Sequence, residues 1–82
     1  MKAAYHYRIT LNLRKLGYNI MDAISKNGLT QAKFAEKSGI SRQYMSKIIN
    51  GHKAPSFQYL AFIATETGTD FNTLLGGVIR RT

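Results

Sequence analysis

The chain of 82 residues has no cysteine, no tryptophan, a single proline and only four acidic residues. Without cysteine it can form neither a disulfide framework nor a thiolate metal site. Its apolar runs are far too short to span a bilayer, and the charged and polar residues throughout its N-terminal stretch argue against a secretory signal. We therefore expect one small soluble domain in the cytoplasm, with no membrane association.

The scarcity of acids leaves the chain strongly basic. Twelve lysine and arginine residues against four acids give a formal net charge of +8, and the isoelectric point is about 10.1. A surplus of this size attracts polyanions, above all nucleic acid. The alternatives are a basic surface that serves only solubility and a membrane-surface binder, but no segment pairs a lysine-rich face with a broad exposed apolar face.

Cap and turn residues divide most of the chain into helices, so we predict an all-α fold. The predicted helices cover residues 16–26, 31–37, 42–50 and 57–67, with a short fifth helix after Asp70. The predicted N-caps carry a side-chain oxygen next to a helix start, and they are Thr30, Ser41, Ser56 and Asp70. The predicted inner face of the fourth helix consists of Phe57, Leu60, Ile63 and Ala64.

The N-terminal arm, residues 1–15, has the two-residue period of a strand. Its alternating apolar positions are Tyr5, Tyr7, Ile9, Leu11 and Leu13. Because a lone strand is not stable, we expect this one to pair with the C-terminal tail, residues 77–82, or with the arm of a second copy. A competing interpretation starts the first helix earlier, on the helical spacing of Ile9, Leu13, Leu16, Ile20 and Ile24. Between the arm and the tail, residues 16–76 form the predicted helical domain.

Residues 30–51 carry the most informative pattern, two short amphipathic helices joined by a tight turn. Ala35 falls where two helices would cross closely, and Gly39 falls at the turn, where a left-handed backbone suits glycine. Ile40 follows as a buried plug, and Met45 and Ile48 lie three residues apart on the inner face of the second helix. These offsets predict a helix-turn-helix unit rather than an ordinary helical hairpin with a solvated polar face.

The opposite face of that second helix is polar and cationic. At about 100° per residue, Tyr44, Met45 and Ile48 cluster on one side. The other side carries Arg42, Gln43, Ser46 and Lys47. No acid occurs between Lys37 and Thr65. Such a face suits the reading of base edges in the major groove of DNA, because arginine and lysine pair with guanine and glutamine pairs with adenine.

With these features in place, the chain from Leu16 to Leu75 resembles the XRE family of helix-turn-helix domains, which includes phage Cro and repressor proteins. The matching residues are Leu16-Gly17, Ile20, Gly28-Leu29-Thr30-Gln31, Phe34-Ala35, Ser38-Gly39-Ile40-Ser41, Met45-Ser46-Lys47-Ile48, Asn50-Gly51, Pro55-Ser56, Leu60, Ile63-Ala64, Gly68 and Leu74-Leu75. The resemblance implies a compact five-helix fold whose third helix enters the major groove. It implies base contacts from Arg42, Gln43 and Lys47, with Ser46 nearby. It also implies phosphate contacts from Gln31, Ser41, Asn50 and Lys53.

Four residues depart from the family pattern. Ile49 stands where a polar residue is common, and Thr67 stands where the fourth helix usually buries a leucine. Tyr59 and Phe62 place aromatic area on a face of that helix that is often polar. The extra apolar groups predict an additional contact surface, unless they are scattered surface hydrophobes. We expect any protein partner to bind through residues 1–15 or through the fourth helix.

The function we predict is a sequence-specific, DNA-binding transcriptional regulator, a Cro-like repressor that binds a two-fold operator as a homodimer at the bacterial nucleoid. The alternative is an antitoxin-type protein that binds a toxin partner and represses its own operon. An enzyme is not expected, because neither His6 nor His52 has an acid beside it in the sequence. Nor does the sequence contain a glycine-rich phosphate cradle or a metal-ligand spacing, so no cofactor is predicted.

Overall fold

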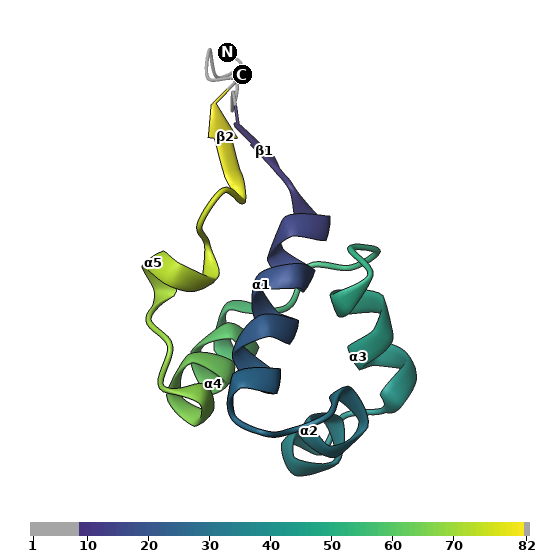
Figure 1. Cartoon of the computed structure of the whole chain (residues 1–82). Coiled ribbons are helices and arrows are strands. Elements are labelled where there is room, and N and C mark those ends of the chain that lie inside the picture. Colours follow the sequence, from purple (N-terminus) through teal and green to yellow (C-terminus); the bar gives the residue numbers. More distant parts are fainter. Residues whose placement is uncertain (1–8, 82) are drawn as a thin grey trace.

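The computed structural model describes residues 9–81, and it has five helices below a short two-stranded ribbon (Figure 1). The elements in chain order are β1 (Ile9–Leu11), α1 (Leu13–Lys26), α2 (Gln31–Ser38), α3 (Arg42–Ile49), α4 (Phe57–Thr67), α5 (Phe71–Leu74) and β2 (Ile79–Arg81). Helix α1 runs through the middle of the molecule and contacts each of the other four helices. The prediction of five helices with an N-terminal strand is confirmed. Within residues 9–81, no helix has the length and apolar character needed to cross a bilayer.

Side-chain caps start the helices at the predicted places. All four predicted N-cap side chains accept a hydrogen bond from the backbone N–H three residues further on, at 2.8 to 3.1 Å. Glycines end α2 and α4 in the left-handed conformation, with φ of 74° at Gly39 and 65° at Gly68. Two predicted ends differ from the structure by one residue, because α2 continues to Ser38 and α3 stops before its C-cap, Asn50.

The predicted start of the first helix at Leu16 is wrong. Helix α1 begins at Leu13, because the side chain of Asn12 caps it and Oδ1 accepts a hydrogen bond from the N–H of Lys15 at 3.0 Å. The arm thus combines the two interpretations, with a strand at residues 9–11 and an earlier helix start. The predicted strand positions 5–8 lie outside the described residues.

Strand β1 pairs with the tail of its own chain. The two strands are antiparallel, and the register is Ile9 opposite Arg81, Thr10 opposite Arg80 and Leu11 opposite Ile79. The ladder extends to the start of α1, where the N–H of Asn12 donates to the carbonyl of Val78 at 2.7 Å. Of the two partners predicted for the strand, the structure therefore contains the intramolecular one.

The core lies between α1 and the surrounding helices. Its buried side chains are Leu16, Ile20, Ala23, Ile24, Phe34, Ala35, Met45, Ile48, Ile63, Leu74 and Val78. Val78 was not anticipated, because one apolar residue after two glycines has no periodicity to mark it. Phe57, which was predicted to face inward, is 74% exposed. It is the first residue of α4, and its ring packs edge-on against Phe71, with centroids 5.4 Å apart, instead of entering the core.

The residues that depart from the family pattern pack within the domain. Ile49, Tyr59 and Phe62 are half-buried and lie against the core. The rings of Tyr59 and Phe62 are stacked with centroids 5.9 Å apart. The hydroxyl of Thr67 donates to the carbonyl of Ile63 at 2.7 Å, so this polar side chain is satisfied within its own helix. The predicted additional surface is thus used mainly in intramolecular packing.

Helices α1 and α3 approach each other closely at Gly17. A Cβ atom on this glycine would overlap the carbonyl oxygen of Ile49 and would lie 2.8 Å from that of Ile48. Both neighbours are backbone atoms, so they cannot give way unless the end of α3 moves. Glycine is required here because of the space available between the helices.

We predict that Gly17→Ala lowers the free energy of unfolding by about 1–3 kcal/mol, because the added methyl group overpacks the crossing of α1 and α3. Urea unfolding followed by circular dichroism measures the change. Gly76→Ala is the control, since its new Cβ atom would lie 3.4 Å from its nearest neighbour, the carbonyl oxygen of Thr73. Equal unfolding midpoints for the two variants would contradict the close approach described here.

Candidate nucleic-acid interface

The unit formed by α2 and α3 is built around the turn at Gly39. The N–H of Gly39 donates to the carbonyl of Glu36, and the N–H of Ile40 donates to that of Ala35, both at 3.1 Å. Ala35 is fully buried, as predicted for a close helix crossing. Ile40, the predicted buried plug, is half-buried and packs against the core. These contacts determine the direction in which α3 leaves the turn.

Helix α3 has one face in the core and one face in solvent. Met45 and Ile48 anchor it, with 0% and 1% of their surface exposed. The residues predicted to contact bases lie on the side away from these anchors, and they are the exposed Arg42, Gln43 and Lys47 with the half-buried Ser46. The structure thus brings all four together on one side of a single short helix.

Ser46 is more engaged within the protein than the other three. Its hydroxyl oxygen accepts a hydrogen bond from the side-chain amide of Asn50 at 3.1 Å. Asn50 is the C-cap of α3, and its backbone N–H donates to the carbonyl of Ser46 at 2.9 Å. The hydroxyl proton of Ser46 remains available to an outside acceptor, as does the second amide proton of Asn50.

The residues predicted to contact phosphate come from α2, from the two caps of α3 and from the loop that follows α3. Gln31 is the first residue of α2 and is half-buried. The side-chain oxygen of Ser41 accepts the N–H of Tyr44 at 3.0 Å, so this cap is partly committed to starting α3. Lys53 is exposed, and its ammonium group lies 5.9 Å from the centre of the Tyr44 ring. Attraction to the ring restricts where this cation lies.

The two acidic side chains that form ion pairs lie away from α3. Asp22 pairs with Lys26 at 3.1 Å within α1, and Glu66 of α4 pairs with Lys37 of α2 at 2.9 Å. Within residues 9–81, no acid forms an ion pair with a cation of α3. The positive charge of this helix is therefore available to an anionic ligand. In the same part of the chain, no group of three histidine or acidic side chains is placed to hold a metal ion.

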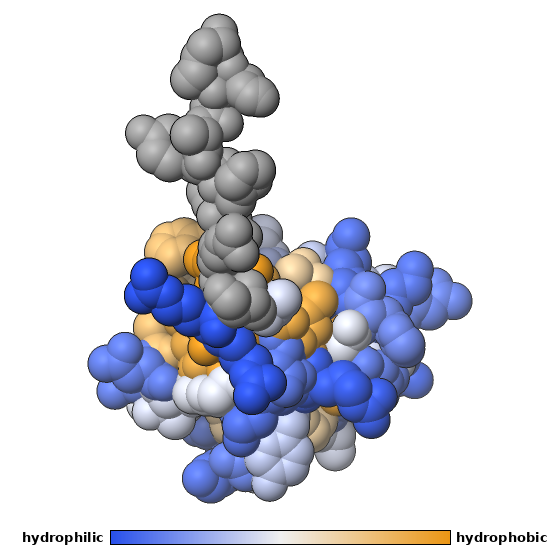
Figure 2. Space-filling model, turned by 90° about the horizontal axis from the view of Figure 1, so that it is seen from above, coloured by the Kyte–Doolittle hydropathy of each residue, from blue (hydrophilic) through white to orange (hydrophobic). Residues whose placement is uncertain are grey.

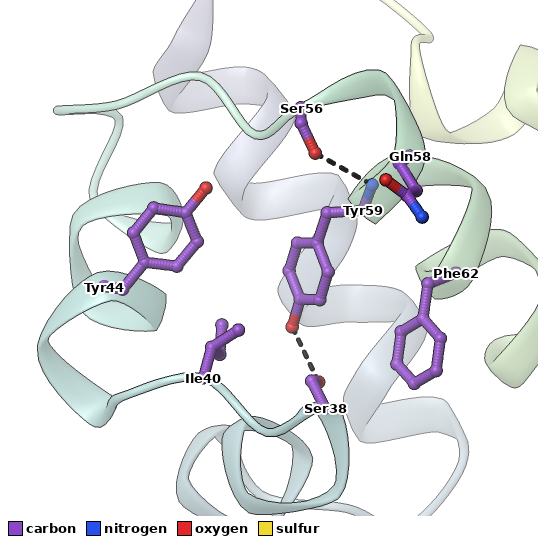
Figure 3. A pocket seen from close by; sticks show the side chains of 7 residues that line it. All are labelled: Ser38, Ile40, Tyr44, Ser56, Gln58, Tyr59 and Phe62. Atoms are coloured by element: carbon purple, nitrogen blue, oxygen red, sulfur yellow. Dashed lines mark hydrogen bonds between the residues drawn. The ribbon is translucent and has the colours of Figure 1, made fainter.

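A pocket of about 340 Å³ lies between the α2–α3 turn and the start of α4 (Figure 3). The side chain of Tyr59 extends from α4 into this pocket, and its hydroxyl shares a hydrogen bond with Ser38 Oγ at 2.8 Å. The same hydroxyl lies 3.5 Å from the sulfur of Met45 on α3. Burial raises the pKa of the Tyr59 phenol, and the hydrogen bond with Ser38 offsets this only in part. Tyr59 thus connects α4 to the end of α2 and to α3.

Arg14 is a basic residue beside the end of α3 that the sequence pattern did not indicate. Arg14 lies so close to Gly51 that a Cβ atom on this glycine would be 2.8 Å from Arg14 Cγ. A hollow of about 260 Å³ here is lined by Arg14, Tyr18, Met21, Ile49 and Asn50. Because the predicted helix began at Leu16, Arg14 was assigned to the arm. The N-cap signal of Asn12 would have placed it on α1.

Comparison with known proteins agrees with this geometry. Residues 20–74 match the family model described as Helix-turn-helix. The chain is 39% identical over 64 residues to the ImmF control region 10 kDa protein of Bacillus phage phi105, which covers 78% of this chain and 71% of the phage protein. It is also similar to the crystal structure of the clp gene regulator ClgR from C. glutamicum, with a TM-score of 0.68 and 30% identity, over 77% of this chain and 82% of that one.

We predict that Tyr59→Phe lowers the free energy of unfolding at neutral pH by about 1 kcal/mol, because the hydrogen bond between the Tyr59 hydroxyl and Ser38 is lost. The difference between wild type and variant should shrink as the pH rises above 10.0, the ordinary pKa of the phenol. The folded protein holds the phenol proton more tightly than the unfolded chain does, so deprotonation in alkali favours unfolding of the wild type alone. Chemical unfolding of both proteins over this pH range provides the measurement. A difference that stays constant or grows with pH would contradict the burial argument.

Proposed function

The chain belongs to the XRE family of helix-turn-helix DNA-binding domains, and we propose that it is a transcriptional repressor that recognises a specific operator in duplex DNA. It acts as a homodimer on a two-fold site, at the nucleoid, and represses by occluding a promoter. The observation that carries the proposal is the exposed cationic face of α3, which the helices around it hold in a fixed position. Such a face fits the major groove and can reach base edges there.

Each side chain proposed to read bases has a chemical counterpart in the groove. Arg42 can donate two hydrogen bonds to the O6 and N7 atoms of guanine. Gln43 can both donate to and accept from adenine, and Lys47 can donate to the guanine acceptors. Ser46 supports these contacts with its free hydroxyl proton. Discrimination between sequences therefore resides mainly in Arg42, Gln43 and Lys47.

A second set of residues orients the protein on the DNA backbone. The proposed phosphate contacts are Gln31 at the first turn of α2, Ser41 and Asn50 at the two ends of α3, and Lys53 in the following loop. Backbone N–H groups at a helix start favour a phosphate, and neutral side chains can donate to it. Of these four residues only Lys53 carries a charge, so only Lys53 displaces a counterion from DNA.

We expect Gln43→Ala to weaken binding to the operator by roughly 1–3 kcal/mol and to change binding to random DNA much less. The operator is first selected from a random duplex library, and affinities are then measured by fluorescence anisotropy at fixed salt. Gln58→Ala is the matched control, because Gln58 is also an exposed glutamine but lies on α4. If Gln43→Ala discriminates between operator and random DNA as well as wild type does, the assignment of base contacts to Gln43 is wrong. If the library yields no preferred sequence, the proposed function itself is wrong.

We also expect the affinity for DNA to fall steeply with salt, and Lys53→Ala to reduce the slope of the log–log plot by about 0.9 for each copy bound. Gln31→Ala should lower the affinity without changing the slope, since an amide releases no counterion. Lys26→Ala is the charge control, because Lys26 pairs with Asp22 on α1. A slope that Lys53→Ala leaves unchanged would remove Lys53 from the proposed phosphate contacts.

A further inference from the structure

The ribbon of β1 and β2 stands away from the helices, and among residues 9–81 no third strand pairs with it (Figure 1). All six of its residues are exposed, including the aliphatic side chains of Ile9 (53%), Leu11 (55%) and Ile79 (55%). Seen from above, this face of the molecule shows hydrophobic surface near its centre, bordered by hydrophilic side chains (Figure 2). A two-stranded ladder this short is marginal in water unless it gains a further partner.

Within residues 9–81, the backbone groups of β1 without a strand partner belong to Ile9 and Leu11. In an antiparallel ladder, opposite residues alternate between pairs that exchange hydrogen bonds and pairs that do not. The N–H of Asn12 donates to the carbonyl of Val78, so the N–H of this residue faces the tail. Because the bonded positions alternate, the next residue of β1 whose backbone groups face β2 is Thr10, opposite Arg80. The N–H and C=O groups of Ile9 and Leu11 therefore point away from β2, toward the outer edge of β1.

We propose that this outer edge of β1 is a homodimer interface, at which β1 pairs antiparallel with β1 of a second copy. A two-fold axis at Thr10 places Ile9 of each copy opposite Leu11 of the other. In that register the outward N–H and C=O groups of Ile9 and Leu11 in the two copies form four hydrogen bonds. Every outward backbone group of residues 9–11 then has a partner. The product is a four-stranded antiparallel sheet that spans the dimer.

The side chains agree with this register. Ile9 and Leu11 face one side of the ribbon together with Ile79 and Arg81, and Thr10 and Arg80 face the other side. Pairing two ribbons therefore joins two sets of three aliphatic side chains into one apolar area, with Arg81 of each copy at opposite corners. Thr10 meets Thr10 of the second copy at the axis, where a non-hydrogen-bonded pair brings side chains close together and two threonines can hydrogen-bond.

Charge favours the edge of β1 over the edge of β2. Strand β2 carries Arg80 and Arg81, both exposed. Pairing its outer edge with a second β2 would place guanidinium groups of the two copies opposite each other, which is destabilising. Strand β1 carries no charge. In the proposed dimer the arginines lie at the two outer edges of the sheet, where charged residues discourage the addition of further strands.

The interface rests on the proposed function, which requires a dimer, and it specifies where that dimer forms. The competing apolar surface is at Phe57, the most exposed large hydrophobic residue among residues 9–81. Its ring already packs against Phe71, and it offers one side chain in place of a row of unpaired backbone groups. The edge of β1 is therefore the surface that gains more from a second copy of the chain.

Cysteine cross-linking on the full chain tests the register, because the natural sequence has no cysteine. Thr10→Cys places two thiols across the axis with Cα atoms about 4.5 Å apart, within the range of a disulfide. Arg80→Cys is the matched control, since it lies directly opposite Thr10 on β2 and would belong to an outer strand of the sheet, away from the axis. Under mild oxidation of dilute protein, Thr10→Cys should become a disulfide-linked dimer and Arg80→Cys should stay monomeric.

A pair of proline variants tests the hydrogen bonds. Leu11→Pro and Ile79→Pro each remove one outward N–H, at two residues that face each other and are equally exposed. Leu11→Pro removes two of the four bonds between copies, so the dimer Kd from sedimentation should rise roughly 30-fold. Ile79→Pro should leave the dimer near its wild-type affinity. Thermal melting followed by circular dichroism checks that both variants keep their helices.

Three results would each overturn the interface: equal cross-linking of the two cysteine variants, a wild-type chain that sediments as a monomer, or a Leu11→Pro variant that dimerises like wild type. DNA binding is measured separately, on a duplex with a single half-site, where Leu11→Pro should bind like wild type because α3 is unchanged. If wild type does not prefer this half-site over random DNA, the proposed function is wrong. The cross-linking result would still show whether the two copies pair through β1.

Discussion

The close approach of α1 and α3 at Gly17 is the constraint on which the rest of the structure depends. With no side chain on this residue, the backbone at the end of α3 rests directly on α1. The other end of α3 is held by the hydrogen-bonded turn at Gly39. A helix of only eight residues is too short to be stable alone. Its orientation is therefore set by these two contacts and by the burial of Met45 and Ile48.

The residues that support α3 are distinct from those proposed to contact DNA. Tyr59 of α4 also helps to position α3, because its hydroxyl is hydrogen-bonded to Ser38 and contacts the sulfur of Met45. Arg42, Gln43 and Lys47 are exposed, and few of their atoms are required by the fold. Because stability and the proposed base contacts depend on different side chains, the exposed positions can change with little effect on the core. A domain organised in this way can acquire new binding preferences while it keeps its structure.

Much of the fold was predictable because local signals agreed with one another. The four predicted N-caps and the left-handed turn at Gly39 are decided by residues close in sequence, and the structure has all of them. The start of α1 was missed because an alternating pattern and a helical one overlap at Leu13, and only the cap at Asn12 separates them. The burial of Val78 and the exposure of Phe57 depend on contacts with distant segments, for which the sequence has no periodic signal.

The same limit applies to the candidate interface. Helical periodicity was enough to place Arg42, Gln43, Ser46 and Lys47 on one side of α3. It could not show that the hydroxyl of Ser46 is already bonded to Asn50, since that depends on how α3 ends. It also could not bring Arg14 to the loop at Gly51, because their contact joins the first helix to the end of the third.

The burial of Val78 has a consequence for how the protein is made. Val78 lies in the same core as Leu16 and Ile20, and β2 pairs with β1 from the other end of the described chain. A ribosome releases the N-terminal segments first, so β1 and the first turns of α1 emerge well before their partners exist. The helices can form and begin to pack during synthesis, but the core is completed only after Val78 has left the exit tunnel. Nascent chains that stall or are truncated before Val78 therefore carry an open core, which marks them for chaperones and proteases.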